Sequence, residues 1–173
     1  MTSVPDRRSA EERFREVFAH LGAVAAYARR RGSRDAEGLA AETMSIAWRR
    51  LADVPRNDPL PWLYATARNL LLAERRAAGR TAAEPPAPPI PAPELRELDP
   101  QLDRALRSLR PADREALLLV AWDDLTPAQA ARTLGIGAAA FRVRLLRARR
   151  RLRAALDEER RPAPLARIDV EGT

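Results

Sequence analysis

A proline-rich segment divides this chain and constrains its fold more than any other feature. Residues 81–98 contain six prolines: Pro85, Pro86, Pro88, Pro89, Pro91 and Pro93. Proline lacks a backbone N–H and fixes φ, so this segment can neither continue a helix nor pair within a sheet. We predict that residues 81–98 form a flexible, extended linker of roughly 55 Å, at about 3.1 Å per residue. The chain is therefore expected to fold as two small domains, which should behave independently.

The segment before the linker, residues 10–80, has the apolar spacing of amphipathic helices. Apolar residues recur three and four positions apart in three runs, which predicts three packed helices. The first run predicts one helix that ends near Arg31. The third helix is expected to begin near Pro59 or Pro61 and to stop at about Gly79. The expected inward-facing residues are Phe14, Val17, Phe18, Leu21, Val24, Ala25, Leu39, Thr43, Ile46, Ala47, Leu51, Leu63, Ala67, Leu70 and Leu71.

The segment after the linker, residues 99–157, is also expected to be helical. Asp99 precedes Pro100, which is the order of an N-cap residue and a first helical residue. A second helix is expected to begin at Pro111, with Leu117 and Leu118 facing inward. Alternation of β-branched residues is nearly absent, so we predict an all-α fold. The tail, residues 158–173, is expected to be disordered.

The clearest local signal predicts a helix-turn-helix in the second domain. Thr126 and Gln129 flank Pro127 with the spacing of a capping box, in which each side chain bonds the other residue's backbone. This helix is expected to end at Gly135, and a longer helix should follow over about residues 138–156. Ala131 lies where two crossing helices leave room for little more than a methyl group. The inward stripe of the last helix is Phe141, Leu145, Ala148 and Leu152.

The charge of the chain indicates a polyanionic partner. The formal net charge is +7, and every basic side chain is an arginine. The last helix contains Arg142, Arg144, Arg147, Arg149, Arg150, Arg151 and Arg153, and no acid lies between Asp124 and Asp157. Nucleic acid is the first candidate partner and an acidic membrane surface the second, because both present dense negative charge. The alternative is that this run is only a solvated helix face.

Other functional classes lack the residues that they need. The chain has no cysteine, which excludes disulfides, thiol catalysis and thiolate metal sites. We find no glycine-rich phosphate loop, no nucleophile paired with a base and no metal cluster around the lone His20. We therefore predict that the protein is not an enzyme and uses no cofactor. No apolar run approaches the roughly 20 residues of a membrane span, and the N-terminus does not resemble a signal peptide, so a cytoplasmic location is expected.

Both halves resemble one bacterial family, the extracytoplasmic-function sigma factors of RNA polymerase. In the second domain the resemblance is carried by Arg114-Glu115-Ala116-Leu117, by Leu134-Gly135-Ile136 and by residues 144–149. In the first domain it is carried by residues 35–49 and by Pro61-Trp62-Leu63-Tyr64 through Ala67-Arg68-Asn69. The resemblance covers roughly residues 14–156 in the order that the family has. It implies a promoter-specificity subunit that binds core RNA polymerase, recognises promoter DNA and helps to open it.

The resemblance also implies roles for individual residues. The residues expected to face polymerase are Leu39, Glu42, Met44, Trp48 and Arg49. Those expected at the melted downstream element are Arg56, Asn57, Trp62, Arg68, Asn69, Arg75 and Arg76. Those expected at the duplex upstream element are Arg142, Arg144, Arg147, Arg149 and Arg150. Aromatic and cationic groups together suit the capture of an unpaired base and its phosphates, although Trp62 is more simply explained by core packing.

Within the last helix we expect Arg142 or Arg144 to contact base edges and Arg147, Arg149 and Arg150 to contact phosphates. An anti-sigma factor is a common partner in this family, and the sequence leaves open whether this chain has one. Two alternatives remain. One is a stand-alone helix-turn-helix regulator that binds duplex DNA without polymerase. The other is a helical protein-interaction module whose arginines only solubilise it.

Overall fold

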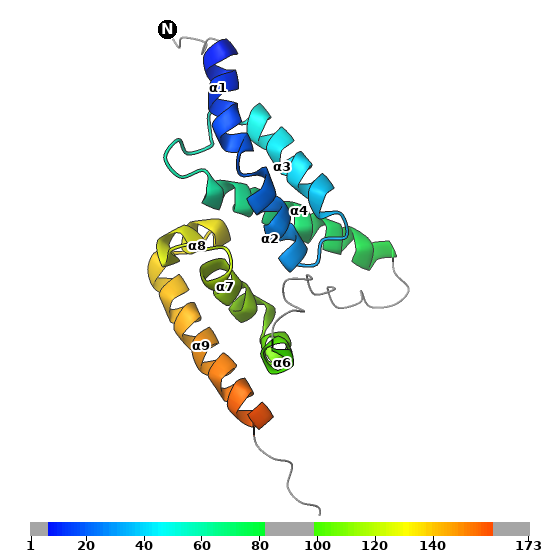
Figure 1. The fold of residues 1–173 in the computed structure, drawn as a ribbon, viewed down its shortest axis with the longest axis vertical. Helices are drawn as coiled ribbons and strands as arrows, with labels where there is room; N and C mark the ends of the chain where they lie inside the picture. Colours follow the sequence, from blue (N-terminus) through cyan, green and yellow to red (C-terminus); the bar gives the residue numbers. More distant parts are fainter. Residues whose placement is uncertain (1–6, 82–98, 161–173) are drawn as a thin grey trace, which may run out of the picture.

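The computed structural model describes residues 7–81 and 99–160, and these residues form α-helices joined by turns (Figure 1). The helices of the N-terminal block are α1 (Arg7–Phe18), α2 (Leu21–Arg30), α3 (Ala36–Arg49) and α4 (Leu60–Thr81). Those of the C-terminal block are α6 (Pro100–Ser108), α7 (Pro111–Ala121), α8 (Pro127–Leu134) and α9 (Ala138–Arg160). The prediction of an all-α fold is confirmed. Most of the expected linker and almost all of the expected tail lie outside the described residues.

The first predicted helix is two helices in the structure. At the break, His20 donates its backbone N–H to the Val17 carbonyl, three residues back rather than four. The tighter turn separates α1 from α2. As a result α1 contacts α3, whereas α2 contacts both α3 and α4. The prediction of one continuous helix was wrong because no glycine or proline marks this break.

The core of the N-terminal block lies where α2, α3 and α4 meet. Val24, Tyr27 and Leu63 are fully buried there. The rings of Tyr27 and Tyr64 stack with their centroids 4.5 Å apart and their planes 15° apart. Stacked aromatic rings add to the free energy gained by burying their area. This contact fixes α2 against α4.

The C-terminal block begins its helices where the capping residues predict. The Asp99 carboxylate accepts a hydrogen bond from the Gln101 backbone N–H at 2.8 Å. Thr126 and Gln129 form the predicted capping box at the start of α8. Gly135 ends α8 with φ of 64°, a left-handed conformation that glycine adopts without steric cost. The last helix begins at the predicted Ala138 and continues past the predicted Leu156 to Arg160.

The two blocks pack against each other, which differs from the expectation of independently moving domains. Helix α4 contacts α8, and buried side chains of both blocks form one continuous apolar cluster. Figure 1 shows the C-terminal block lying beneath α2 and α4, with α9 along its outer edge. The boundaries of the two blocks as independently folding domains remain a prediction.

Candidate nucleic-acid interface

Helices α8 and α9 form the predicted helix-turn-helix. The backbone N–H of Ile136 donates to the Ala131 carbonyl at 3.0 Å, which closes the turn after Gly135. Ala131 is buried, as expected for a residue at a helix crossing. Since the cap, the turn and the crossing are all formed by local contacts, α9 is held at a fixed angle to α8.

Helix α9 has one buried face and one outward face. Phe141, Leu145 and Ala148 point into the core, which confirms the predicted inward stripe at these positions. Because successive helical residues are about 100° apart, residues two positions away lie on the opposite side. Val143 and Leu146 occupy that side, with side chains about half exposed at 53% and 51%. They form the centre of the outward face, and no role was predicted for them from the sequence.

The arginines of α9 lie at different distances from this centre. Arg142 and Arg147 flank Val143 and Leu146, and both are exposed. Arg144 lies beside the buried Leu145 and is only partly exposed. Arg151 is also exposed, with 42% of its side chain accessible, but it forms an ion pair with the buried carboxylate of Asp113 in the same block. Of the two residues expected to contact base edges, Arg142 is therefore the better placed. The other expected phosphate-contacting residues of α9, Arg149 and Arg150, are exposed.

The residues expected at melted DNA lie around the start and along the length of α4. Arg56 and Asn57 are exposed in the loop that precedes this helix, and Asn69 and Arg76 are exposed along it. Arg68 is partly exposed. These side chains are available for contacts with a nucleic-acid strand.

Two other residues of this set make contacts within the protein. Trp62 is partly buried against the core, and the Arg50 guanidinium lies 5.9 Å from the centroid of its ring. Arg75 donates a hydrogen bond to the Arg31 carbonyl at 2.5 Å. Trp62 therefore packs against the core, which agrees with the simpler explanation given for it from the sequence.

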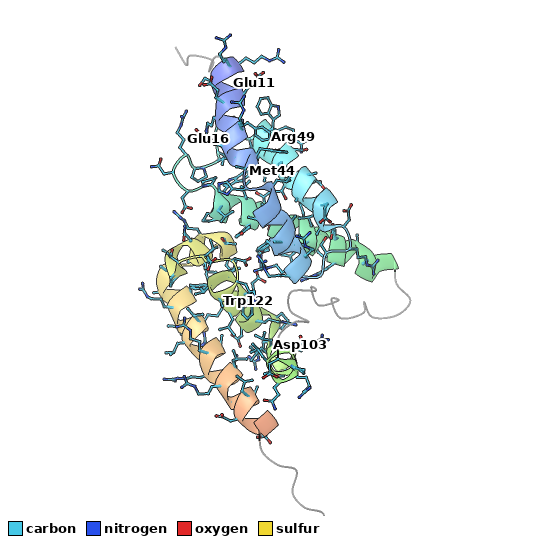
Figure 2. All side chains as sticks on the ribbon, viewed as in Figure 1. Glu11, Glu16, Met44, Arg49, Asp103 and Trp122 are labelled. Carbon is cyan, nitrogen blue, oxygen red and sulfur yellow. The ribbon has the colours of Figure 1, made fainter. Side chains whose placement is uncertain are left out.

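The expected polymerase face of α3 needs a correction. Leu39 and Met44 are buried, with 3% and 2% of their surface exposed, so they hold α3 in the bundle and cannot face a partner. Figure 2 shows Met44 and Arg49 on the same helix, and only Arg49 is exposed. The motif predicts a helix over these residues, which the structure confirms, but it does not give the direction of each side chain.

An exposed aromatic cluster accompanies the remaining α3 residues. Trp48 is 44% exposed and meets the Phe14 ring edge to face, with the centroids 5.0 Å apart. Phe18 is 47% exposed and lies 5.9 Å from Phe14. Glu42 is exposed on the same helix as Trp48. Phe14 and Phe18 were both predicted to face inward because their spacing fits a buried stripe. Phe14 is partly buried against the core, whereas the prediction for Phe18 was wrong.

A buried cluster of charges joins the two blocks. The Arg31 guanidinium donates to the Glu115 carboxylate at 2.9 and 3.0 Å and to Asp123 at 2.8 Å. Arg30 also forms an ion pair with Asp123. The Tyr27 hydroxyl donates to Glu115 at 3.2 Å, and the Arg31 guanidinium lies 3.6 Å from the centroid of the Tyr27 ring. We call Arg30, Arg31, Glu115 and Asp123 the inter-block cluster.

Burial alters the titration of the groups around this cluster. Burial of Arg31 by itself lowers its pKa, but Tyr27, Glu115 and Asp123 outweigh that effect and raise the pKa of Arg31. Burial raises the pKa of Tyr27, and it raises the pKa of Tyr64 to about 12. Arg31 therefore stays charged, and both phenols stay neutral, throughout the physiological range.

Within the described residues there is neither a metal site built from protein side chains nor a membrane-spanning helix. These residues contain no group of three or more potential protein ligands that could hold a metal ion. None of their helices is both long and apolar enough to span a bilayer.

Comparison with known proteins identifies both blocks. The family model for sigma-70 region 2 matches residues 17–81, and the model for sigma-70 region 4 matches residues 100–152. A search of curated proteins finds no match.

Two solved structures share the fold over most of the chain. The first is CnrH in complex with the cytosolic domain of CnrY, with 25% sequence identity, a TM-score of 0.59 and coverage of 90% of this chain and 92% of CnrH. The second is the sigma factor RpoE in complex with the anti-sigma factor NepR from Bartonella quintana. It has 26% identity, a TM-score of 0.61 and coverage of 84% of this chain and 97% of RpoE. The chain belongs to the sigma-70 family, and it is a promoter-recognising sigma factor of the extracytoplasmic-function type.

Proposed function

We propose that this sigma factor uses three surfaces, two that recognise promoter DNA and one that binds polymerase. The outward face of α9 contacts the duplex upstream element. The loop before α4 and the exposed side of α4 contact the melted downstream element. The exposed side of α3 contacts core RNA polymerase. The observation that carries the proposal is the arginine-flanked outward face of α9, held in a complete helix-turn-helix.

On α9 the proposed contacts follow from position. The second helix of a helix-turn-helix enters the major groove, and its outward side chains reach the base edges. Val143 and Leu146 suit the methyl groups of thymine, while Arg142 suits a guanine edge. Arg147, Arg149 and Arg150 lie further along the helix, where it leaves the groove, and suit phosphates. Arg144 has a smaller role in this proposal because its side chain is partly covered.

On the N-terminal block the proposed contacts use exposed polar groups. Arg56 and Asn57 lie in the loop where the family captures an unpaired base, and Asn69 and Arg76 continue along α4. Cations that follow the strand and polar groups that bond an unpaired base are what single-stranded DNA requires. For polymerase, the proposed surface is Glu42, Trp48 and Arg49, extended by Phe18.

Transcription in vitro with core RNA polymerase and a library of genomic promoters tests the proposal. The full chain should direct initiation from a small set of promoters that core enzyme alone ignores. Glu42→Arg combined with Trp48→Ala should weaken co-purification with core enzyme without loss of helical content. Undiminished binding by this double variant would remove the α3 surface from the proposal. Duplex binding without any polymerase-dependent transcription would favour the stand-alone regulator.

An anti-sigma partner is a further part of the proposal. Both similar structures above are complexes with a second protein, and for RpoE that protein is an anti-sigma factor. We propose that a protein of this kind holds the present chain inactive. Purification of the tagged chain from its own cells, followed by mass spectrometry, tests this. Recovery of polymerase subunits alone, in cells where the target promoters are silent, would contradict it.

A further inference from the structure

A carboxylate of the N-terminal block lies against the first helix of the helix-turn-helix. Asp58 precedes α4, and both of its oxygens accept hydrogen bonds from the Gln129 side-chain amide, at 3.1 and 3.2 Å. The same carboxylate forms an ion pair with Arg132. Beside it, the Thr133 hydroxyl donates to the Pro61 carbonyl at 3.3 Å in a buried contact. The surrounding hollow is lined by Asp58, Thr126, Ala128, Gln129, Ala131, Arg132, Ile136 and Ala138.

The groups that hold Asp58 are those that proteins use to hold DNA phosphates. The first helix of a helix-turn-helix crosses the DNA backbone. Arginine and glutamine side chains are common phosphate donors at such positions. The Arg132 side chain is 58% exposed, so a phosphate could reach it if Asp58 moved away. The Asp58 carboxylate supplies the negative charge and paired acceptor oxygens that a phosphate would supply.

The inter-block cluster is a second contact that holds the two blocks together, in addition to the contact of α4 with α8. Arg30 and Arg31 come from the N-terminal block, whereas Glu115 and Asp123 come from the C-terminal block. The side chains of Arg31 and Asp123 are 4% and 0% exposed, so separation of the blocks must rehydrate both. Within the cluster two cations meet two anions, which leaves no uncompensated charge. Together with the packing of α4 on α8, the cluster holds the blocks at the distance at which Asp58 contacts Arg132.

We propose that Asp58 is an internal substitute for a DNA phosphate at Gln129 and Arg132, so that the closed arrangement of the two blocks competes with binding of duplex DNA. Separation of the blocks at the inter-block cluster then releases α8 for the DNA backbone. This inference rests on the proposed function of α8 and α9 as the duplex-binding helices.

The first experiment measures duplex binding by the full chain. The probe is a short fluorescein-labelled duplex of mixed sequence, and its anisotropy is followed at one moderate salt concentration. Asp58→Asn should tighten binding by roughly twofold to fivefold, as expected for release of a partly exposed ion pair. Asp53→Asn is the matched control, because it removes the same charge from the same loop. Its carboxylate pairs with Arg50 of its own block, so it should change affinity much less.

Arg132 completes this experiment as a double-mutant cycle. Arg132→Ala alone should weaken duplex binding, because it removes a phosphate donor. In the Arg132→Ala background, Asp58→Asn should tighten binding clearly less than it does in the wild-type chain, because only Gln129 is then left to be released. Equal gains for Asp58→Asn with and without Arg132 would overturn the inference.

The second experiment measures the separation of the blocks. Because the chain has no cysteine, Ser45→Cys on α3 and Ala154→Cys on α9 give two exposed attachment points for a fluorescence energy-transfer pair. Arg31→Ala and the conservative Glu115→Gln should both lower transfer efficiency and tighten duplex binding, with helical content checked by circular dichroism. Loss of transfer without tighter binding would overturn the inference, as would unchanged transfer in both variants.

Failure of the inference can be distinguished from failure of the proposed function. If the wild-type chain and every variant fail to bind the duplex even at low salt, the proposed function of α8 and α9 is wrong and the inference is wrong with it. If they bind but Asp58→Asn and Asp53→Asn behave alike, only the inference is wrong.

Discussion

Arginines serve opposite purposes on α9 and at the inter-block cluster. On α9 the side chains of Arg142, Arg147 and Arg150 are exposed, and no acid occurs between Asp124 and Asp157 to neutralise them. At the cluster, Arg31 is buried and bonds two carboxylates of the other block. The first arrangement leaves positive charge available to a phosphate, and the second uses it to join two parts of one chain. The position of the nearest acids, rather than the arginine itself, decides the role.

The largest expected effect is at the cluster. Asp123→Ala should lower the free energy of unfolding by about 3–5 kcal/mol, because it leaves two buried guanidinium groups without their shared carboxylate. Asp53→Ala, which breaks an exposed pair with Arg50, should cost no more than about 1 kcal/mol. Urea unfolding followed by circular dichroism measures both. Equal effects would mean that the cluster is not the buried contact described above.

Alkaline pH should lower the free energy of unfolding, because it ionises the two buried phenols beside the inter-block cluster. Burial raises the pKa of Tyr64 to about 12, and it also raises the pKa of Tyr27. The contribution of the two neutral phenols to the free energy of unfolding is therefore fully present below about pH 10. It is lost as pH rises from there toward the folded-state values, because the unfolded chain then releases its phenolic protons more readily. These are the only two tyrosines of the chain, so phenolate absorbance reports on them alone. Titration of either phenol near pH 10 in the folded protein would contradict the burial.

On α9, the binding free energy lost when an arginine is replaced should depend on the DNA sequence. Arg142→Ala should cost about 1–3 kcal/mol on a cognate promoter and much less on a scrambled one, as expected for a base-edge contact. Arg144→Ala should have a smaller effect on both, because its side chain is partly covered. Binding measured on the two duplexes compares the variants. A larger sequence-dependent loss for Arg144→Ala would reverse the assignment of the base-contacting residue.

The smallest expected effect concerns the apolar centre of the α9 face. Replacement of thymine by uracil in the upstream element removes a methyl group and should weaken binding by less than about 1 kcal/mol per contact. The combined Val143→Ala and Leu146→Ala variant should no longer distinguish the two duplexes. An unchanged preference for thymine in that variant would place the methyl contact elsewhere.

The sequence predicted the parts of the structure that depend on neighbouring residues. The capping box at Thr126, the turn at Gly135 and the start of α9 follow from side chains within a few positions of each other, and all are confirmed. The break between α1 and α2 was missed because Ala19 and His20 are not residues that ordinarily end a helix, so the sequence carries no local signal there. The inter-block cluster was missed because Arg31 is 84 and 92 residues from Glu115 and Asp123.

The candidate site shows the same division. The arginine run and its missing acids were visible in the sequence, as was the helix that carries them. The direction of each side chain was visible only in part. The apolar spacing placed Leu39 inward, whereas the family resemblance assigned Leu39 and Met44 to polymerase, and both are buried. Val143 and Leu146 occupy the centre of the outward face, which the sequence did not indicate. A family motif predicts which helix contacts a partner, whereas the packing of the core determines which residues of that helix remain exposed.

The salt dependence of promoter binding tests the central claim, that the outward face of α9 binds DNA, most directly. Each phosphate contact removed should lower the slope of log K against log salt by about one unit, so Arg147→Ala, Arg149→Ala and Arg150→Ala should each show this change. Arg151→Ala is the matched control on the same helix, because Arg151 is paired with Asp113. It should leave the slope close to that of the wild type. If the three test variants keep the wild-type slope and affinity, the arginines of α9 are a solvated surface and the assignment of the DNA-binding face is wrong.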